Sequence, residues 1–134
     1  MLEYRARAEG RTPLARVRAV GAASADPPYL ATVPALAADK ALARAGLKRE
    51  DIGLVEINEA FAVVTLVSLA MGGWDPEIVN VNGGAIALGH PIGASGARIV
   101  LTLAIEMRHR GVQFGLAAIC SGGRQGEAVV LELV

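Results

Sequence analysis

The hydrophobic positions of this chain form separate runs, with polar or glycine-rich segments between them. The shorter runs alternate with polar residues or are bounded by turn formers, which is typical of β-strands. The longer runs have apolar residues at helical spacing and end at glycine or basic residues, which is typical of helices. The expected order is therefore β-α-β-α-β-α-β-β. The expected strands are 14–23, 54–57, 78–81, 116–120 and 128–134, and the expected helices are 33–45, 60–71 and 95–110.

Proline and glycine mark the ends of the expected helices. Pro34 lies at the start of the first helix and Gly46 follows its end, the usual asymmetry of these two residues. Gly72 and Gly73 stop the second helix, whose almost wholly apolar sequence predicts burial on more than one face. These residues therefore separate the expected helices from the strands on either side of them.

Strands alternating with helices predict an α/β fold. We expect a mixed, mainly parallel five-stranded sheet with helices on both faces, its first strand at an edge and its last pair antiparallel. Residues 13–134 are expected to form this single domain, and the charged residues 1–12 a solvated arm or the remnant of a connection. Residues 24–32, with the consecutive Pro27 and Pro28, predict a loop.

Composition and charge narrow the possible partners and the compartment. The chain has 134 residues, of which 53% are apolar, so a buried interface is expected. A formal net charge of +0 gives no reason to expect nucleic acid or an anionic membrane as partner. No apolar run approaches the ~18 residues of a membrane span, and the first residues lack a secretion signal, so a cytoplasmic location is expected. The single cysteine, Cys120, cannot form an internal disulfide, and the sequence predicts no metal site.

Three polar groups follow strands that end at the same edge of the predicted sheet. Asn58 follows the strand 54–57, His90 lies in the loop after the third strand, and Cys120 ends the fourth. Because sites in α/β sheets form at the carboxyl ends of strands, we expect these three groups to converge.

The loop around His90 is the most distinctive stretch of the chain. Residues 80–98, NVNGGAIALGHPIGASGAR, set five glycines around this histidine, and Pro91 biases it towards an extended backbone. Such a loop presents an imidazole at the entrance of a helix. Alone, it also fits a histidine with a purely structural hydrogen bond.

The segment after Cys120 has a second chemical signature. Its glycines, among them Gly122, allow backbone N–H groups to point at one spot, as in an oxyanion hole, although such a segment also fits a simple turn. With His90 nearby, Cys120 could be held partly as thiolate and act as a nucleophile or as a base. Together these groups suit acyl transfer or proton abstraction beside a thioester carbonyl.

Three sequence blocks resemble the C-terminal half of thiolases, the acetyl-CoA acetyltransferases and 3-ketoacyl-CoA thiolases. The similarity extends over residues 12–134. The blocks are NEAFA at 58–62, GGAIALGHPIGASGAR at 83–98 and CSGGRQG at 120–126. NEAFA favours the classical thiolases over condensing relatives of the same fold.

The resemblance implies a role for each matching residue. His90 would activate the nucleophilic cysteine and bind the thioester oxygen, with a water held by Asn58 completing this first oxyanion hole. Phe61 would line the pocket. Cys120 would be the acid/base that acts on the α-carbon of the substrate, and the backbone N–H of Gly122 would contribute to a second oxyanion hole. A coenzyme A thioester would be the substrate, without a separate cofactor.

Three nearby residues either have two interpretations or differ from the residues usual in the family. Glu59 would either orient its neighbours or favour the start of a helix through the helix dipole. Arg124 stands where thiolases commonly have a third glycine, and Ser121 where an apolar residue is frequent. We expect the side chain of Arg124 to point to solvent.

The resemblance also implies a partner. In thiolases the nucleophilic cysteine and the loop domain that grips coenzyme A belong to an N-terminal half, so this chain alone is expected to be inactive. The apolar segment 99–105, which begins with Ile99 and ends with Ile105, would expose a face that such a half, or a second copy of the chain, must cover. The alternative function is a non-catalytic association module with at most weak acyl-CoA binding.

Overall fold

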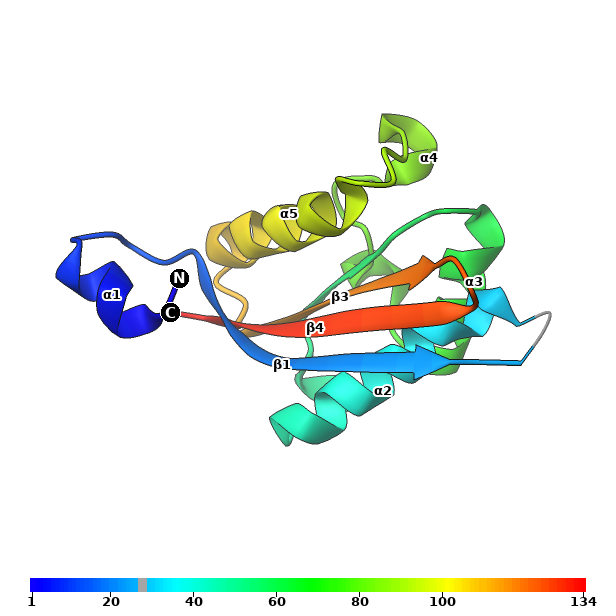
Figure 1. Cartoon of the computed structure of the whole chain (residues 1–134), viewed down its shortest axis with the longest axis horizontal. Helices are drawn as coiled ribbons and strands as arrows, with labels where there is room; N and C mark the ends of the chain where they lie inside the picture. Colours follow the sequence, from blue (N-terminus) through cyan, green and yellow to red (C-terminus); the bar gives the residue numbers. More distant parts are fainter. Residues whose placement is uncertain (27–28) are drawn as a thin grey trace.

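The computed structural model describes residues 1–26 and 29–134, and its centre is a four-stranded mixed sheet with helices on both faces (Figure 1). The strand order is β1-β4-β3-β2. The strands are β1 (Ala15–Ser24), β2 (Leu54–Ile57), β3 (Phe114–Ser121) and β4 (Gln125–Leu133). The α-helices are α1 (Glu3–Ala8), α2 (Val33–Ala45), α3 (Ala62–Gly72), α4 (Ala85–Leu88) and α5 (Ser95–Arg110), and the 3₁₀ turns are Leu30–Thr32, Arg49–Asp51 and Pro76–Ile78.

The structure confirms the α/β class, the mixed sheet with helices on both faces, and β1 at an edge. It also confirms the bounds of α2, α5 and β2. The expectation of a mainly parallel sheet is wrong, because β4 runs antiparallel to both β1 and β3 and only β2 and β3 pair in parallel. The expected count of five strands is also wrong.

The missing fifth strand is the segment 78–81. Val79 forms a single parallel bridge with Val55, and Asn80 then turns the chain away with φ +48°. The Asn80 amide takes the place of a strand neighbour: its Oδ1 accepts from the Ile57 N–H at 2.8 Å, and its Nδ2 donates to the Ile57 carbonyl at 2.9 Å. A side chain therefore completes the pairing of β2 that backbone was expected to make.

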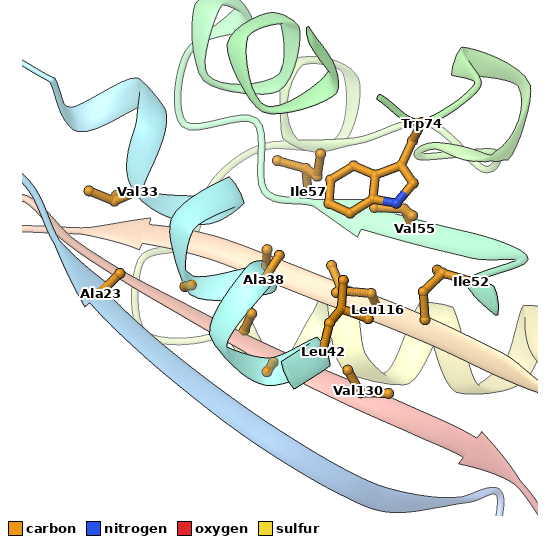
Figure 2. Close-up of a cluster of buried hydrophobic side chains, with 14 of the residues drawn as sticks. Ala23, Val33, Ala38, Leu42, Ile52, Val55, Ile57, Trp74, Leu116 and Val130 are labelled. Atoms are coloured by element: carbon orange, nitrogen blue, oxygen red, sulfur yellow. The ribbon is translucent and has the colours of Figure 1, made fainter. Parts of the chain in front are cut away.

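Helix α2 packs closely on the face of β1 and β4. A Cβ atom at Gly21 would lie 2.3 Å from the Ala37 carbonyl oxygen, and one at Gly126 would lie 2.3 Å from the Val33 carbonyl oxygen. Only glycine in the strands allows this approach. Larger side chains from α2, the sheet and the segment after α3 fill the rest of this core (Figure 2), including Leu42, Val55, Ile57, Trp74, Leu116 and Val130.

Helix α3 is less buried than its sequence predicts. Val64 is 1% exposed and Ser68 0%, whereas Val63 is 53% and Leu66 65% exposed. The expectation of burial on more than one face is therefore wrong for this helix. A covered face and an open apolar face lie on opposite sides of it.

Helix α5 covers the other face of the sheet only in part (Figure 1). Ile99, Leu103 and Met107 are buried between α5 and the sheet, while Leu101 is 52% and Ile105 39% exposed. The helix packs on β2 and β3, so the β1 side of this face stays open. The predicted exposed apolar face of 99–105 is thus present.

The predicted arm 1–12 contains a helix, α1, whose Glu3 forms a 2.8 Å ion pair with Arg16 of β1. The two chain ends lie close together beside α1 (Figure 1). Of the predicted loop 24–32, Pro27 and Pro28 lie outside the described residues. Within residues 1–26 and 29–134, no helix is long and apolar enough to cross a membrane.

Candidate active site

Asn58 extends the line of β2 into the centre of the site. Its backbone N–H donates to the Ala118 carbonyl at 3.0 Å, which continues the pairing of β2 with β3 for one residue. Its side chain is 0% exposed. Strand alternation points it to the side of α5, together with Leu54 and Glu56.

Glu59 anchors the glycine loop to the end of β2. One carboxylate oxygen accepts from the Ile86 N–H at 2.9 Å, and the other accepts from Asn80 Nδ2 at 3.2 Å. Gly84 packs directly on this carboxylate, because a Cβ atom there would lie 2.3 Å from Glu59 Cδ. These contacts favour an orienting role for Glu59 over that of a residue at a helix start.

His90 lies within reach of a polar partner at each ring nitrogen. Asn58 Nδ2 is 3.4 Å from Nε2, and Ser95 Oγ is 2.6 Å from Nδ1. The Ser95 hydroxyl donates its proton to the Pro91 carbonyl at 3.1 Å, so it accepts from Nδ1–H. This arrangement favours the Nδ1–H tautomer, in which the Nε2 lone pair faces the Asn58 amide.

Arg98 and Glu56 extend this network behind Asn58. Arg98 Nη2 donates to Asn58 Oδ1 at 3.4 Å. Burial raises the pKa of Glu56 to about 7, against the opposing effect of the Arg98 guanidinium, while the charges of Glu59 and Glu106 raise it further. A buried carboxyl group and a half-buried guanidinium therefore lie next to the predicted site.

The sequence reasoning did not assign these two residues or Ser95 to the site. The spacing of these residues in the sequence could have indicated that they belong to the site. Asn58 follows β2 two residues after Glu56, so the two side chains point to the same face of the sheet. Ser95 and Arg98 are three residues apart on α5 and therefore lie on the same face of that helix.

Cys120 lies at the end of β3 and is 6% exposed. With His90, Ile92 and the turn residue Gly122 it lines a cavity of about 360 Å³. Burial raises the pKa of the Cys120 thiol. This shift favours the protonated thiol over the thiolate and so acts against the expected partial thiolate.

The turn after Cys120 is shorter than its sequence predicts. Ser121 pairs with Gln125, so only the residues between them form the turn. Gly122 is exposed, and among the described residues its N–H donates no backbone hydrogen bond. Arg124 is exposed, as expected, at the rim of the cavity.

Phe61 does not join the other predicted site residues. Its side chain is 63% exposed, and Ala60 lines the cavity in its place. The structure thus brings Asn58, His90 and Cys120 to one edge of the sheet and leaves Phe61 outside. In the described part of the chain, no three His, Cys, Asp or Glu side chains are placed to hold a metal ion.

The order and spacing of these residues match a known family. A family model described as the C-terminal domain of thiolase matches residues 11–133. The chain belongs to the thiolase family. It corresponds to the C-terminal domain of that family, which agrees with the resemblance of the three sequence blocks.

Similar proteins and structures are also thiolases. The acetyl-CoA acetyltransferase of Paracoccus denitrificans is 52% identical over 132 residues, which are 98% of this chain and 34% of that protein. The 3-ketoacyl-CoA thiolase of Yersinia enterocolitica is 51% identical over 137 residues, which cover 100% of this chain and 35% of that protein. The chain therefore spans about a third of the length of these relatives.

Two solved thiolase structures share the fold of this chain. A crystal structure of human mitochondrial 3-ketoacyl-CoA thiolase in complex with CoA has a TM-score of 0.94 and 42% identity, over 98% of this chain and 34% of that one. The acetyl-CoA acetyltransferase of Bacillus anthracis has a TM-score of 0.95 and 42% identity, over 100% of this chain and 34% of that one.

Proposed function

We propose that this thiolase domain supplies part of the active site of an acetyl-CoA acetyltransferase or 3-ketoacyl-CoA thiolase. The reaction is Claisen condensation or thiolysis of acyl-CoA thioesters, a step of fatty acid metabolism in the cytoplasm. The nucleophilic cysteine comes from an N-terminal thiolase half. The observation that supports this most strongly is that His90, held beside Asn58, lines the same cavity as Cys120.

Each group has a task that suits its surroundings. The Nε2 lone pair of His90 takes the proton of the nucleophilic cysteine, and the resulting N–H then donates to the thioester oxygen. Burial favours the protonated thiol of Cys120, which can protonate the α-carbon in thiolysis. The exposed backbone N–H of Gly122 donates to the second carbonyl oxygen.

An open apolar surface supports the need for a partner. Between α5 and the uncovered part of the sheet lies a hollow of about 470 Å³, lined by apolar residues including Val20, Val100, Ile119 and Val129. Val17 and Val20 of β1 are 61% and 55% exposed. An N-terminal thiolase half is the partner we propose for this face, and a second copy of the chain is the alternative.

The test compares the chain alone with the chain joined to an N-terminal half. The half is taken from the Paracoccus denitrificans acetyl-CoA acetyltransferase, and thiolysis of acetoacetyl-CoA is followed by its absorbance. We expect no turnover by the chain alone and turnover by the joined protein. In the joined protein, Cys120→Ala and His90→Ala each lower kcat by about 10²–10⁴-fold, whereas replacing the exposed His109 by alanine has no effect.

Two outcomes would contradict the proposal. Turnover by the chain alone that Cys120→Ala abolishes would show that no partner half is required. A folded joined protein without thiolysis would favour the alternative of a non-catalytic association module. That alternative predicts instead self-association of the chain and weak binding of acetyl-CoA, measured by sedimentation and by calorimetry.

A further inference from the structure

A buried carboxyl group, Glu56, and a half-buried guanidinium, Arg98, lie near Asn58 without an assigned role. Glu56 is 3% exposed and, two residues before Asn58, points to the same side of β2. Arg98 lies three residues after Ser95 and shares its face of α5. Asn58 and Ser95 are the two side chains that contact His90. Each of them therefore has a charged residue close to it on the same face, Glu56 near Asn58 and Arg98 near Ser95.

Arg98 determines which way the Asn58 amide faces. A guanidinium carries only hydrogen-bond donors, so the Asn58 atom 3.4 Å from Arg98 Nη2 must be the oxygen. The amide NH₂ is then left to face His90 Nε2, which is 3.4 Å away. If the Asn58 amide were flipped, its NH₂ group would face the N–H donors of Arg98, and its oxygen would face Nε2 of His90.

The two hydrogen bonds of His90 then require the same proton position. An NH₂ group at Nε2 needs a lone pair there, and the Ser95 hydroxyl, which donates to the Pro91 carbonyl, needs a proton on Nδ1. We infer that Arg98 is a positioning residue that orients Asn58 and so keeps His90 in its Nδ1–H tautomer. The catalytic value of this lone pair rests on the proposed function, but the tautomer itself does not.

Glu56 and Arg98 interact only through their charges, because among the described residues Glu56 Oε2, Arg98 Nε and Arg98 Nη1 have no hydrogen-bond partner. The charges of Arg98 and Glu56 act on one another, and the Arg98 guanidinium opposes the rise in the Glu56 pKa that burial causes. Glu59 and Glu106 are the other charged groups that act on Glu56. Because burial raises the Glu56 pKa by more than the Arg98 charge lowers it, the attraction between the two side chains does not offset the cost of burying the Glu56 carboxylate.

The experiment reads the tautomer directly from ¹⁵N chemical shifts of the imidazoles in the labelled chain at pH 8. We expect His90 in the wild-type chain to be mainly Nδ1–H. In Arg98→Met, the ratio of Nδ1–H to Nε2–H should fall about five-fold, the equivalent of one net hydrogen bond, and Arg98→Lys should restore part of it. The exposed His109 identifies the second set of signals.

Matched variants separate this effect from a general loss of structure. Ser95→Ala should lower the same ratio, and replacing the exposed Arg108 of α5 by methionine should leave it unchanged. If Arg98→Met does not fold, the neutral pair Glu56→Gln with Arg98→Met replaces it. An Nε2–H tautomer in the wild-type chain, or an unchanged ratio in a folded variant without Arg98, would overturn the inference. A failure to catalyse thiolysis would contradict only the proposed function.

Discussion

Glu56 should limit the stability of the chain at neutral pH. The group is 3% exposed, and burial raises its pKa from the ordinary 4.5 to about 7 despite the nearby Arg98. Ionising this carboxyl is therefore less favourable in the folded chain than in the unfolded one. Glu56→Gln keeps the shape of the protonated side chain and removes the ionisation.

The size and the sign of the effect on the free energy of unfolding follow from the two pKa values of Glu56. Below about pH 4.5 the Glu56 carboxyl is protonated in both the folded and the unfolded chain, so it does not lower the free energy of unfolding. Between about pH 4.5 and 7 the carboxyl loses its proton in the unfolded chain but keeps it in the folded chain, so the free energy of unfolding falls as the pH rises. Above about pH 7 the full cost applies. Since each pH unit between the two pKa values corresponds to about 1.4 kcal/mol, this cost is about 3 kcal/mol. It is a large share of the ~5–15 kcal/mol that stabilises a typical domain.

Urea unfolding at pH 4 and pH 8 tests this reasoning. At pH 8 the unfolding midpoint of Glu56→Gln should exceed that of the wild-type chain by roughly 1–3 M, and at pH 4 the two should agree. Glu77→Gln removes an exposed carboxylate and serves as the control, with little change at either pH. An equal difference at both pH values, or no difference at pH 8, would refute a raised pKa for Glu56.

Other substitutions test the packing, the loop anchor and the open face. Gly21→Ala should lower the free energy of unfolding by about 3 kcal/mol or more, because the new Cβ would lie 2.3 Å from the α2 backbone. Gly96→Ala, in contrast, should raise it by about 0.5–1 kcal/mol, because Gly96 lies in a helix with free space around its Cβ position. Asn80→Ala should cost about 2–4 kcal/mol through its lost hydrogen bonds, against under about 1 kcal/mol for the exposed Asn82→Ala. Equal costs in either pair, by thermal unfolding, would contradict these assignments. Leu101→Glu should weaken binding of a partner half or a second copy at least ten-fold in sedimentation, and unchanged binding would exclude α5 from the interface.

The sequence predicted best those elements whose ends depend on local chemistry. Pro34 and Gly46 fixed both ends of α2, and Gly46 adopts the left-handed conformation that ends a helix. The convergence of Asn58 with His90 was also predicted correctly, although the segment 78–81 before the His90 loop makes only a single bridge with β2 instead of forming a strand. Family resemblance then supplied chemical roles that spacing alone left open.

Long-range contacts account for what the sequence did not predict. No local sequence pattern indicates that the side-chain amide of Asn80, and not the backbone of a fifth strand, would pair with Ile57. The burial predicted around α3 failed for a similar reason: its apolar faces have no neighbour within the described chain to cover them. Arg98 entered the site through a contact with Asn58, 40 residues away in sequence.

The same Asn80 amide also influences how copies of this chain can meet. Exposed strand edges invite a further strand and lead to aggregation. At β2 the amide occupies the outward N–H and C=O of Ile57. At β1 the Arg44 guanidinium covers the Val20 carbonyl at 2.8 Å, and an irregularity in register follows Val17. Both margins of the sheet thus carry contacts that hinder the addition of a strand, which favours association through the apolar surface around α5 over extension of the sheet from one molecule to the next.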